Sequence, residues 1–461
     1  MTRTEFQAIV LAGGRGTRFQ ELTGERLKCL LPIGPFPMIF YPLHMLQRHD
    51  FQEIIVVVLE SERSDIQQAL ERTPIKAKLD FVTLPSESNY GTAEALRAIS
   101  DRIKCDLVLV SCDTITNIDL FTMLNHFRQN KASIVTQLFK GGLDADTIVP
   151  GPKAKHKQDR DLIGIQAGTQ RLAFLASASD YEETLNLSYH LLRHYDHITM
   201  HSRLIDSHIY IINKWVIDYL KTQTQVFSVK GELVPKIVKK QMSRPQKNHE
   251  NEKPFSVVNI SQDDVFHHIL QNDVDRKQHD LDQKITETSS FNESVNRNPF
   301  GDDVIRCYAL KPQENRFGIR VNTTLSYCTI NQKIFDLWPQ LFANNAPPLE
   351  SPQANIRSTQ MTNCAVADYA TVTEKTSLKN CVLGTNSTVN QKTRISNSVL
   401  MNGVIIEEGC VIENCVICDK AVVKKGCILK NCLVGPNHVV AENTNKEKVH
   451  LSNSDAYMEI E

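Results

Sequence analysis

The sequence lacks an excess of charge of either sign. Its 461 residues include 52 Lys and Arg against 53 Asp and Glu, and no long basic tract disturbs that balance. Electrostatics therefore gives no reason to expect a nucleic acid or another polyanion as a direct partner. Hydrophobic residues make up 41% of the chain, which is enough to bury a core in each of about two or three domains.

Long apolar segments are also missing. The first residues, Met1–Glu5, lead directly into a strand-like run without the apolar centre of a signal peptide. No later run approaches the length that crosses a bilayer. We therefore expect a cytosolic protein without a membrane partner.

Cysteine spacing that suits a metal is scarce. Cys415 and Cys418 resemble half of a zinc site, but no second Cys/His pair lies at a suitable distance. Reduced thiols behave as small hydrophobic side chains. Six of the twelve cysteines lie within aliphatic runs: Cys105, Cys112, Cys328, Cys381, Cys415 and Cys432. We expect buried free thiols rather than disulfides or zinc.

Short aliphatic runs alternate with helix-like segments over residues 1–240, which predicts an α/β domain with a parallel sheet. The clearest expected strands are 54–59 and 106–110, and the clearest helices are 65–71, 92–100 and 120–127. Residues 241–303 are polar and predict a flexible insert with one short helix at 264–270. Residues 304–345 regain strand and helix character, so we expect them to close the α/β domain.

A repeat occupies residues 360–445. The pattern Asn380-Cys-Val-Leu recurs from Asn397, Asn414 and Asn431, and each start lies 17 residues after the previous one. Further aliphatic residues recur about six residues apart, which is typical of hexapeptide repeats that stack as a parallel β-helix. The end of such a solenoid leaves strand edges unpaired, so we expect an assembly surface there.

The first strand-like run leads into a glycine-rich loop. Phe6–Leu11 is followed by Ala12-Gly-Gly-Arg-Gly-Thr-Arg18, in which glycines let backbone amides approach an anion and Arg15 and Arg18 add positive charge. The loop lacks the third glycine of a dinucleotide fingerprint and the Gly-Lys-Ser/Thr of a P-loop. By itself it predicts no particular ligand.

The wider pattern resembles the sugar-nucleotidyltransferase family. The matching positions are Leu11–Arg18, Leu22-Thr23, Lys28, Leu30–Gly34 and Pro37-Met38. Members such as GDP-mannose and ADP-glucose pyrophosphorylases join this domain to a hexapeptide β-helix. The resemblance implies a nucleotidyltransferase-like, Rossmann-like α/β domain followed by a C-terminal left-handed parallel β-helix.

The resemblance also implies a nucleotide site. Its residues would be Leu11, Gly13, Gly14, Arg15, Lys28, Gly91 and Asp113. The segment Gly91-Thr92-Ala93 would face the base, and Asp113 would be the one metal ligand. A ligand would be GTP or a sugar nucleotide with magnesium, although no cofactor is required. The alternative is that Asp113 caps a following helix.

Several positions depart from the family. The family's Pro-Leu-Thr and Pro-Lys-Pro are Glu21-Leu-Thr and Leu27-Lys-Cys here, and the Glu-Lys pair that holds the sugar phosphate is Ala176-Ser177. Loss of that lysine removes charge that would align a phosphate. The family's Asn-Ala-Gly is Asp206-Ser-His, without the glycine that allows close backbone approach. We expect the transferase chemistry to be lost.

This combination resembles the gamma and epsilon subunits of the guanine-nucleotide exchange factor for eukaryotic translation initiation factor 2. Epsilon continues into a helical-repeat domain, whereas this chain ends at Glu461 soon after the repeat, so a gamma-type subunit is expected. The resemblance implies pairing with epsilon, assembly with alpha, beta and delta, and contact with initiation factor 2, including its phosphorylated alpha subunit. Two alternatives stay open: an active pyrophosphorylase of the GDP-mannose type, and a nucleotide sensor without catalysis.

Overall fold

The computed structural model describes most of the chain. The described residues are 5–14, 16, 20–24, 26–86, 90–141, 147–152, 160–181, 184–243, 264–271, 303–342 and 346–452. Of the expected flexible insert at 241–303, only 241–243, 264–271 and 303 are among them, so most of that prediction lies outside the described residues. Arg15 and Arg18 also lie outside the described residues.

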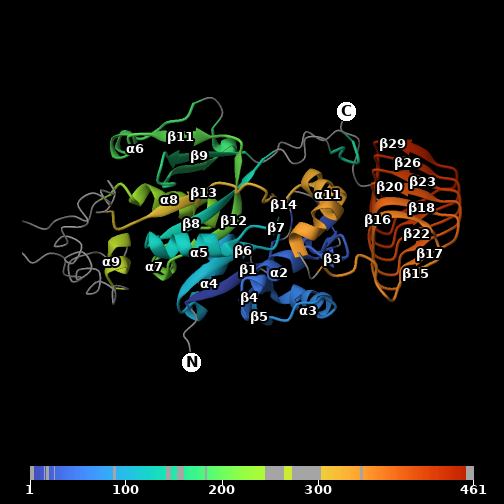
Figure 1. The fold of residues 1–461 in the computed structure, drawn as a ribbon, viewed down its shortest axis with the longest axis horizontal. Helices are drawn as coiled ribbons and strands as arrows, with labels where there is room; N and C mark the ends of the chain where they lie inside the picture. The colour runs from blue at the N-terminus through green and yellow to red at the C-terminus, as the bar shows by residue number, and fades with distance from the viewer. Residues whose placement is uncertain are drawn as a thin grey trace, which may run out of the picture.

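A seven-stranded sheet forms the centre of the N-terminal part (Figure 1). Its strands, in spatial order, are β13 (Cys307–Leu310), β8 (Ile134–Lys140), β12 (Leu204–Ile212), β6 (Asp106–Ser111), β1 (Phe6–Leu11), β4 (Glu53–Leu59) and β5 (Lys78–Leu84). The expected strands at 54–59 and 106–110 are confirmed as β4 and β6. Both are buried on both faces, as their continuous aliphatic runs predicted.

Helices cover both faces of this sheet. Side chains of alternate parity along β1 enter two separate clusters, with Ile9 in one and Ala8 and Val10 in the other. The helices packed on the Ile9 face are α4 (Thr92–Ala98), α7 (Lys214–Thr222), α8 (Val234–Lys240) and α9 (Val265–Gln271). Those on the opposite face are α2 (Phe40–Arg48), α3 (Arg63–Glu71) and α5 (Leu120–Gln129). The expected helices 65–71, 92–100, 120–127 and 264–270 are confirmed as α3, α4, α5 and α9.

The sheet is mixed rather than parallel throughout, which corrects the sequence expectation. Strand β12 runs antiparallel to both β6 and β8. The chain does not return from β8 to β12 through a helical crossover. It passes through a three-stranded sheet made of β10 (Leu172–Ser177), β9 (Asp161–Gln166) and β11 (Ile198–His201), with α6 (Tyr189–His194) beside it. It therefore enters β12 from the opposite end.

Small elements complete this part. Two-stranded ladders join β14 (Gly318–Arg320) to β7 (Thr114–Thr116) and β2 (Pro32–Ile33) to β3 (Phe36–Pro37). Short helical segments are α1 (Gln20–Thr23), η2 (Lys28–Leu30), η3 (Glu60–Glu62), η4 (Ser100–Arg102), η5 (Ala178–Asp180) and η6 (Val229–Leu233).

The C-terminal part is a parallel β-helix (Figure 1). One face is the column β15 (Asn355–Ile356), β17 (Thr371–Val372), β19 (Thr388–Val389), β22 (Ile405–Ile406), β25 (Val422–Val423) and β28 (Val439–Val440). The other faces share the long strands β16 (Gln360–Val366) and β18 (Ser377–Leu383). They continue as β20 (Arg394–Ser396), β23 (Val411–Glu413), β26 (Ile428–Lys430) and β29 (Asn445–Glu447), and as β21 (Val399–Leu400), β24 (Val416–Ile417), β27 (Leu433–Val434) and β30 (His450–Leu451).

The corners of the β-helix explain its 17-residue period. Residues with left-handed backbone recur in three series at that spacing. One series is Asn363, Asn380, Asn397, Asn414, Asn431 and Lys448; the second is Tyr369, Asn386, Gly403, Lys420 and Asn437; the third is Lys375, Lys392, Gly409, Gly426 and Asn443. Asn and Gly tolerate positive φ better than other residues, so the repeated Asn marks a corner of each coil.

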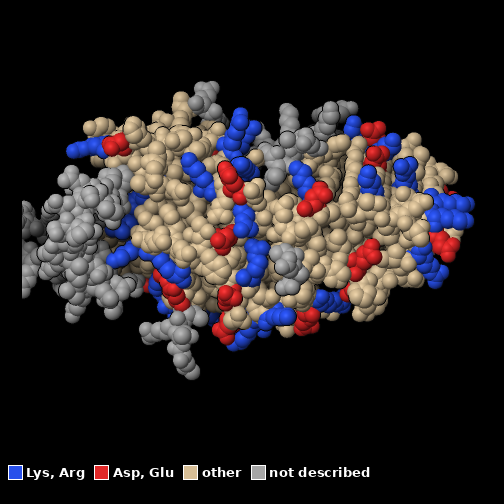
Figure 2. All heavy atoms as spheres, viewed as in Figure 1, with Lys and Arg blue, Asp and Glu red and all other residues tan. Residues whose placement is uncertain are grey.

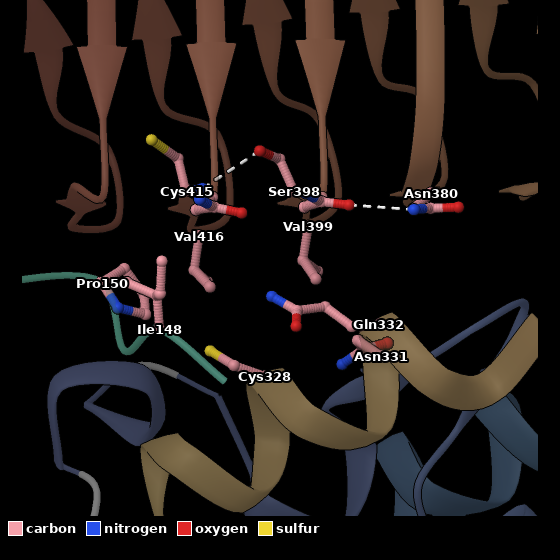
Figure 3. Close-up of a pocket in the computed structure, with 12 residues that line it drawn as sticks. Ile148, Pro150, Cys328, Asn331, Gln332, Asn380, Ser398, Val399, Cys415 and Val416 are labelled. Atoms are coloured by element: carbon pink, nitrogen blue, oxygen red, sulfur yellow. Dashed lines mark hydrogen bonds between the residues drawn. The ribbon is translucent and has the colours of Figure 1, made fainter. Parts of the chain in front are cut away.

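Helix α11 (Thr324–Phe342) lies between the two parts (Figure 1). Its buried side chains, including Tyr327 and Cys328, form one apolar cluster with Val399 and Val416 of the β-helix. Figure 3 shows the contact, where the free volume is only about 10 Å³. That is room for about one water molecule, so the contact is a packed core rather than a ligand site.

The surface and the cysteines agree with the sequence expectations. Figure 2 shows acidic and basic side chains interspersed over the visible face, without an extended area of one sign. All twelve cysteines are free, and all except Cys105 are buried, which confirms the predicted thiols. Within the described ranges, no helix is both long and apolar enough to span a membrane.

Candidate nucleotide site

The predicted glycines lie at the point of the sheet where the strand order reverses. Strand β1 lies between β4 and β6, and ligands of such sheets bind beyond the strands' carboxyl ends at this switch point. Leu11 ends β1, Gly13 and Gly14 follow it, and Asp113 comes shortly after β6. The Cys112 amide donates to the Leu11 carbonyl at 3.1 Å, which holds the two strand ends side by side. The structure therefore brings these predicted residues to one edge.

The backbone at Gly14 is open. A Cβ at Gly14 would meet no atom within 4 Å, whereas a Cβ at Gly13 would contact Leu59 at 3.6 Å. Gly14 is also exposed, which is what anion binding by backbone amides requires.

Gly16 lies close to Thr23 and Lys28. Its φ is +67°, and a Cβ there would approach Thr23 to 3.0 Å and Lys28 to 3.2 Å. The Thr23 hydroxyl donates to the Gly16 carbonyl at 3.2 Å. Glycine favours this conformation and leaves room for Thr23 and Lys28 to lie close to residue 16.

Two cations hold the Asp113 carboxylate. Lys28 Nζ donates to Asp113 Oδ2, and Arg320 Nε lies 3.4 Å from the same oxygen. Only 1% of the Asp113 side chain is exposed. Burial alone would raise the pKa of this carboxyl, but Lys28, followed by Arg320, holds the pKa well below its usual range. Asp113 is thus a buried, ionised partner of two basic side chains.

A backbone ladder places Arg320 at this position. Arg320 pairs with Thr114 between β14 and β7, and the Val321 amide donates to the Asp113 carbonyl at 2.8 Å. A Cβ at Gly318 would lie 2.1 Å from the Phe139 ring, so β14 can approach only because residue 318 is glycine.

His208 stands at the position where the resembled family has glycine. Strand β12 is irregular between Asp206 and Tyr210, and His208 has a φ of 57°. The backbone thus keeps a conformation that glycine favours, although the residue carries a side chain. Burial, followed by the charge of Arg320, lowers the pKa of His208 well below its usual value, so the imidazole is neutral. We refer to Lys28, Asp113, His208 and Arg320 as the Asp113 cluster.

The neighbouring carboxylates also form hydrogen bonds and an ion pair with other residues of the chain. Asp206 accepts hydrogen bonds from the Tyr210 hydroxyl and from Thr136, the latter at 2.9 Å. Asp161 accepts from the Asp206 amide at 2.9 Å, and its Oδ1 lies 2.8 Å from Lys230 Nζ. Burial raises the pKa of Asp206. These acidic groups are therefore engaged within the protein.

Ser177 lies next to this network. It ends β10 opposite Asp161, and its hydroxyl lies 2.8 Å from the Ser179 hydroxyl. A serine hydroxyl is short and uncharged, so position 177 offers no ammonium group to a sugar phosphate.

Gly91 packs against the backbone of Phe227, in another segment of the chain. It precedes α4, and a Cβ there would lie 2.2 Å from the Phe227 carbonyl oxygen. The Ala93 amide donates to that carbonyl at 2.9 Å, and the Thr92 hydroxyl accepts from the Val229 amide at 2.9 Å. Internal packing therefore explains the Gly-Thr-Ala segment without a nucleotide base.

Magnesium does not fit the Asp113 cluster. The single negative charge of Asp113 already meets the two positive charges of Lys28 and Arg320. Of the two carboxylate oxygens of Asp113, only Oδ1 lacks a hydrogen bond. Magnesium requires several oxygen ligands and strong negative charge. No group of three or more His, Cys, Asp or Glu suited to a metal occurs among the residues that the structure describes.

The helix-cap alternative for Asp113 is wrong. The element after Asp113 is strand β7, and α5 is capped by Asp119, whose carboxylate accepts from the Phe121 amide at 3.1 Å.

Sequence reasoning also missed Arg320. The apolar alternation of Phe317, Ile319 and Val321 predicts a strand but does not identify its partner.

Family models match both parts of the chain. The nucleotidyl transferase model matches residues 7–146, and the model of the eIF2B subunit epsilon LbH domain, a left-handed β-helix, matches residues 352–445. These matches agree with the α/β domain and the β-helix described above.

Three relatives of this chain share the name eIF2B subunit gamma. The eIF2B gamma subunit of Schizosaccharomyces pombe is 32% identical over 54% of this chain and 55% of its own length. That of Caenorhabditis elegans is 31% identical over 51% of this chain and 59% of its own length. This chain is similar to eIF2B gamma subunits. The gamma subunit of Dictyostelium discoideum extends the similarity to 82% of this chain and 87% of its own length, at 26% identity. The match to the first two gamma relatives spans only a little over half of their length.

Proposed function

We propose that this chain is a gamma-type subunit of eIF2B, the exchange factor for translation initiation factor 2. It pairs with the epsilon subunit in the cytosol, assembles with alpha, beta and delta, and contacts initiation factor 2, including the form with a phosphorylated alpha subunit. The observation that carries this proposal is the similarity to three gamma subunits, one of them along 87% of its length.

We also propose that the chain does not catalyse nucleotidyl transfer. Three features of the described residues support this: the Asp113 carboxylate is neutralised by Lys28 and Arg320, position 177 has no amino group, and Phe227 occupies the space beside Gly91. Transfer of a phosphoryl group depends on positioned positive charge around the phosphates and on their metal ion. A site arranged in this way retains the exposed Gly14 but lacks the groups that would hold the metal ion and the sugar phosphate.

Co-isolation of partners tests the first proposal. The full-length tagged chain is purified from a cytosolic extract, and stoichiometric partners are identified by mass spectrometry. We expect an epsilon-type subunit together with alpha, beta and delta subunits and initiation factor 2. Recovery of the chain only as self-oligomers would overturn the proposal.

An activity assay tests the second proposal against an active pyrophosphorylase of the GDP-mannose type. That alternative draws on the nucleotidyl transferase match and on the open loop at Gly14. The pure chain is incubated with pyrophosphate and GDP-mannose or ADP-glucose, beside an active pyrophosphorylase as positive control. We expect no release of nucleoside triphosphate; release in proportion to the chain's concentration would establish the alternative.

A further inference from the structure

The Asp113 cluster places two protein cations beside one buried carboxylate. Lys28 Nζ and Arg320 Nε both face Asp113 Oδ2, and the side chains of Lys28 and Arg320 are only 12% and 15% exposed. Charges this close and this shielded from solvent interact strongly. The cluster therefore neutralises the charge of the carboxylate without a bound ion.

The backbone fixes Arg320 in this role. The β14–β7 ladder pairs Arg320 with Thr114, and the hydrogen bond from the Val321 amide to the Asp113 carbonyl holds β14 beside Asp113, which directly precedes β7. The fold therefore fixes the backbone position of Arg320 beside Asp113. The imidazole of His208 is neutral and adds no negative charge.

We infer that Lys28 and Arg320 replace a divalent cation at Asp113, so that the intact chain does not bind magnesium or manganese at this edge of the sheet. A divalent ion beside Asp113 Oδ1 would meet two positive charges and one carboxylate, and repulsion would exceed attraction. This inference stands whether or not the chain assembles into eIF2B.

Reversal of the charge at position 320 tests this inference. Arg320→Asp removes one cation and adds a carboxylate on the strand that is hydrogen-bonded beside Asp113. One or two carboxylates are the usual protein ligands of magnesium. The substitution should therefore create the metal site that the parent chain lacks.

Manganese binding to the purified full-length chain is measured by electron paramagnetic resonance, with magnesium as competitor. We expect no saturable binding by the parent that depends on Asp113, and at least about tenfold tighter binding by Arg320→Asp. Arg316→Asp is the matched control, because it makes the same charge change at an exposed position nearby. It should behave as the parent does.

Two further variants keep the result interpretable. Arg320→Gln removes the positive charge without adding a negative one, so its affinity for manganese should lie between those of the parent and Arg320→Asp. If Arg320→Asp fails to fold, this variant carries the test. Saturable manganese binding by the parent that Asp113→Asn abolishes would overturn the inference, as would a folded Arg320→Asp chain that binds no better than Arg316→Asp.

Discussion

At the scale of single residues, charge balance decides what the candidate site can hold. Lys28 is present in the sequence pattern of the nucleotidyltransferases, but the structure gives it Asp113 as its partner. The same carboxylate also faces Arg320, so two basic residues share one acid. A residue type that matches a family pattern can therefore serve the fold instead of a ligand.

Asp113→Asn tests the strength of this arrangement. The amide would leave Lys28 and Arg320 close together without a compensating charge, and loss of one partner from a buried ionic group costs about 3–5 kcal/mol of unfolding free energy. Urea denaturation of the full chain measures the change. Glu53→Gln is the control, because its partner Lys78 lies in an exposed ion pair. Equal midpoints for the two variants would show that the buried contacts do not form.

Stability should also fall in mild acid because His44 is neutral in the folded chain. It packs against Phe40 and Phe342, and burial followed by Arg48 lowers its pKa to about 4. The folded pKa is below that of the unfolded chain, so protonation favours unfolding once the pH falls below about 6.5. The loss approaches about 1.4 kcal/mol per pH unit between there and the folded pKa.

His44→Phe should remove this part of the pH dependence. The urea midpoint should then fall less between about pH 7 and about pH 5 than it does in the parent. His190→Phe, at an exposed position, is the control. An identical acid response in the parent and His44→Phe would contradict the assignment of His44 as a half-buried, neutral group.

At the scale of elements, the β-helix shows how a short pattern specifies a large structure. Each Asn of the repeat occupies a corner with positive φ, and the residue that follows it is buried. The Asn380 side chain donates to Asn397 Oδ1 at 3.0 Å, so successive corners also contact one another. The repeat therefore encodes both backbone conformation and stacking.

Asn414 offers a direct test of the corner. Its φ is 49°, a conformation that costs alanine about 1–2 kcal/mol and glycine much less. Asn414→Ala should lower the thermal midpoint, while Asn414→Gly should stay close to the parent. If glycine destabilises the chain as much as alanine does, the side chain of Asn414 matters more than its backbone conformation.

The elements were more predictable from sequence than the candidate site was. The strands β4 and β6, the helices α3 to α5 and the β-helix follow from local periodicity, which needs no knowledge of distant partners. The antiparallel entry of β12 was missed because strand direction depends on how the chain returns from the small sheet. Arg320 was missed because its contact with Asp113 depends on a ladder between segments far apart in sequence.

At the scale of the whole molecule, the candidate site and the β-helix are connected. Arg26 lies in the segment between Gly16 and Lys28, and its Nη1 is 2.6 Å from Asp419 Oδ1 in the β-helix. Helix α11 adds a second connection, because the Tyr327 hydroxyl donates to the Pro32 carbonyl at 2.9 Å while neighbouring side chains pack on the β-helix. We expect the two parts to unfold as one unit.

Val416→Asp tests that expectation, because Val416 faces Cys328 and Ile148 across the contact between α11 and the β-helix (Figure 3). An unpaired carboxylate in this apolar cluster should cost about 2–4 kcal/mol and weaken the contact. Calorimetry should then show two separated transitions where the parent shows one. Ile405→Asp is the matched control, since Ile405 lies on an outer face of the β-helix and is 40% exposed. A single transition at the parental temperature in Val416→Asp would mean that this cluster does not join the two parts, and that the Arg26–Asp419 pair and the hydrogen bonds beside it do so instead.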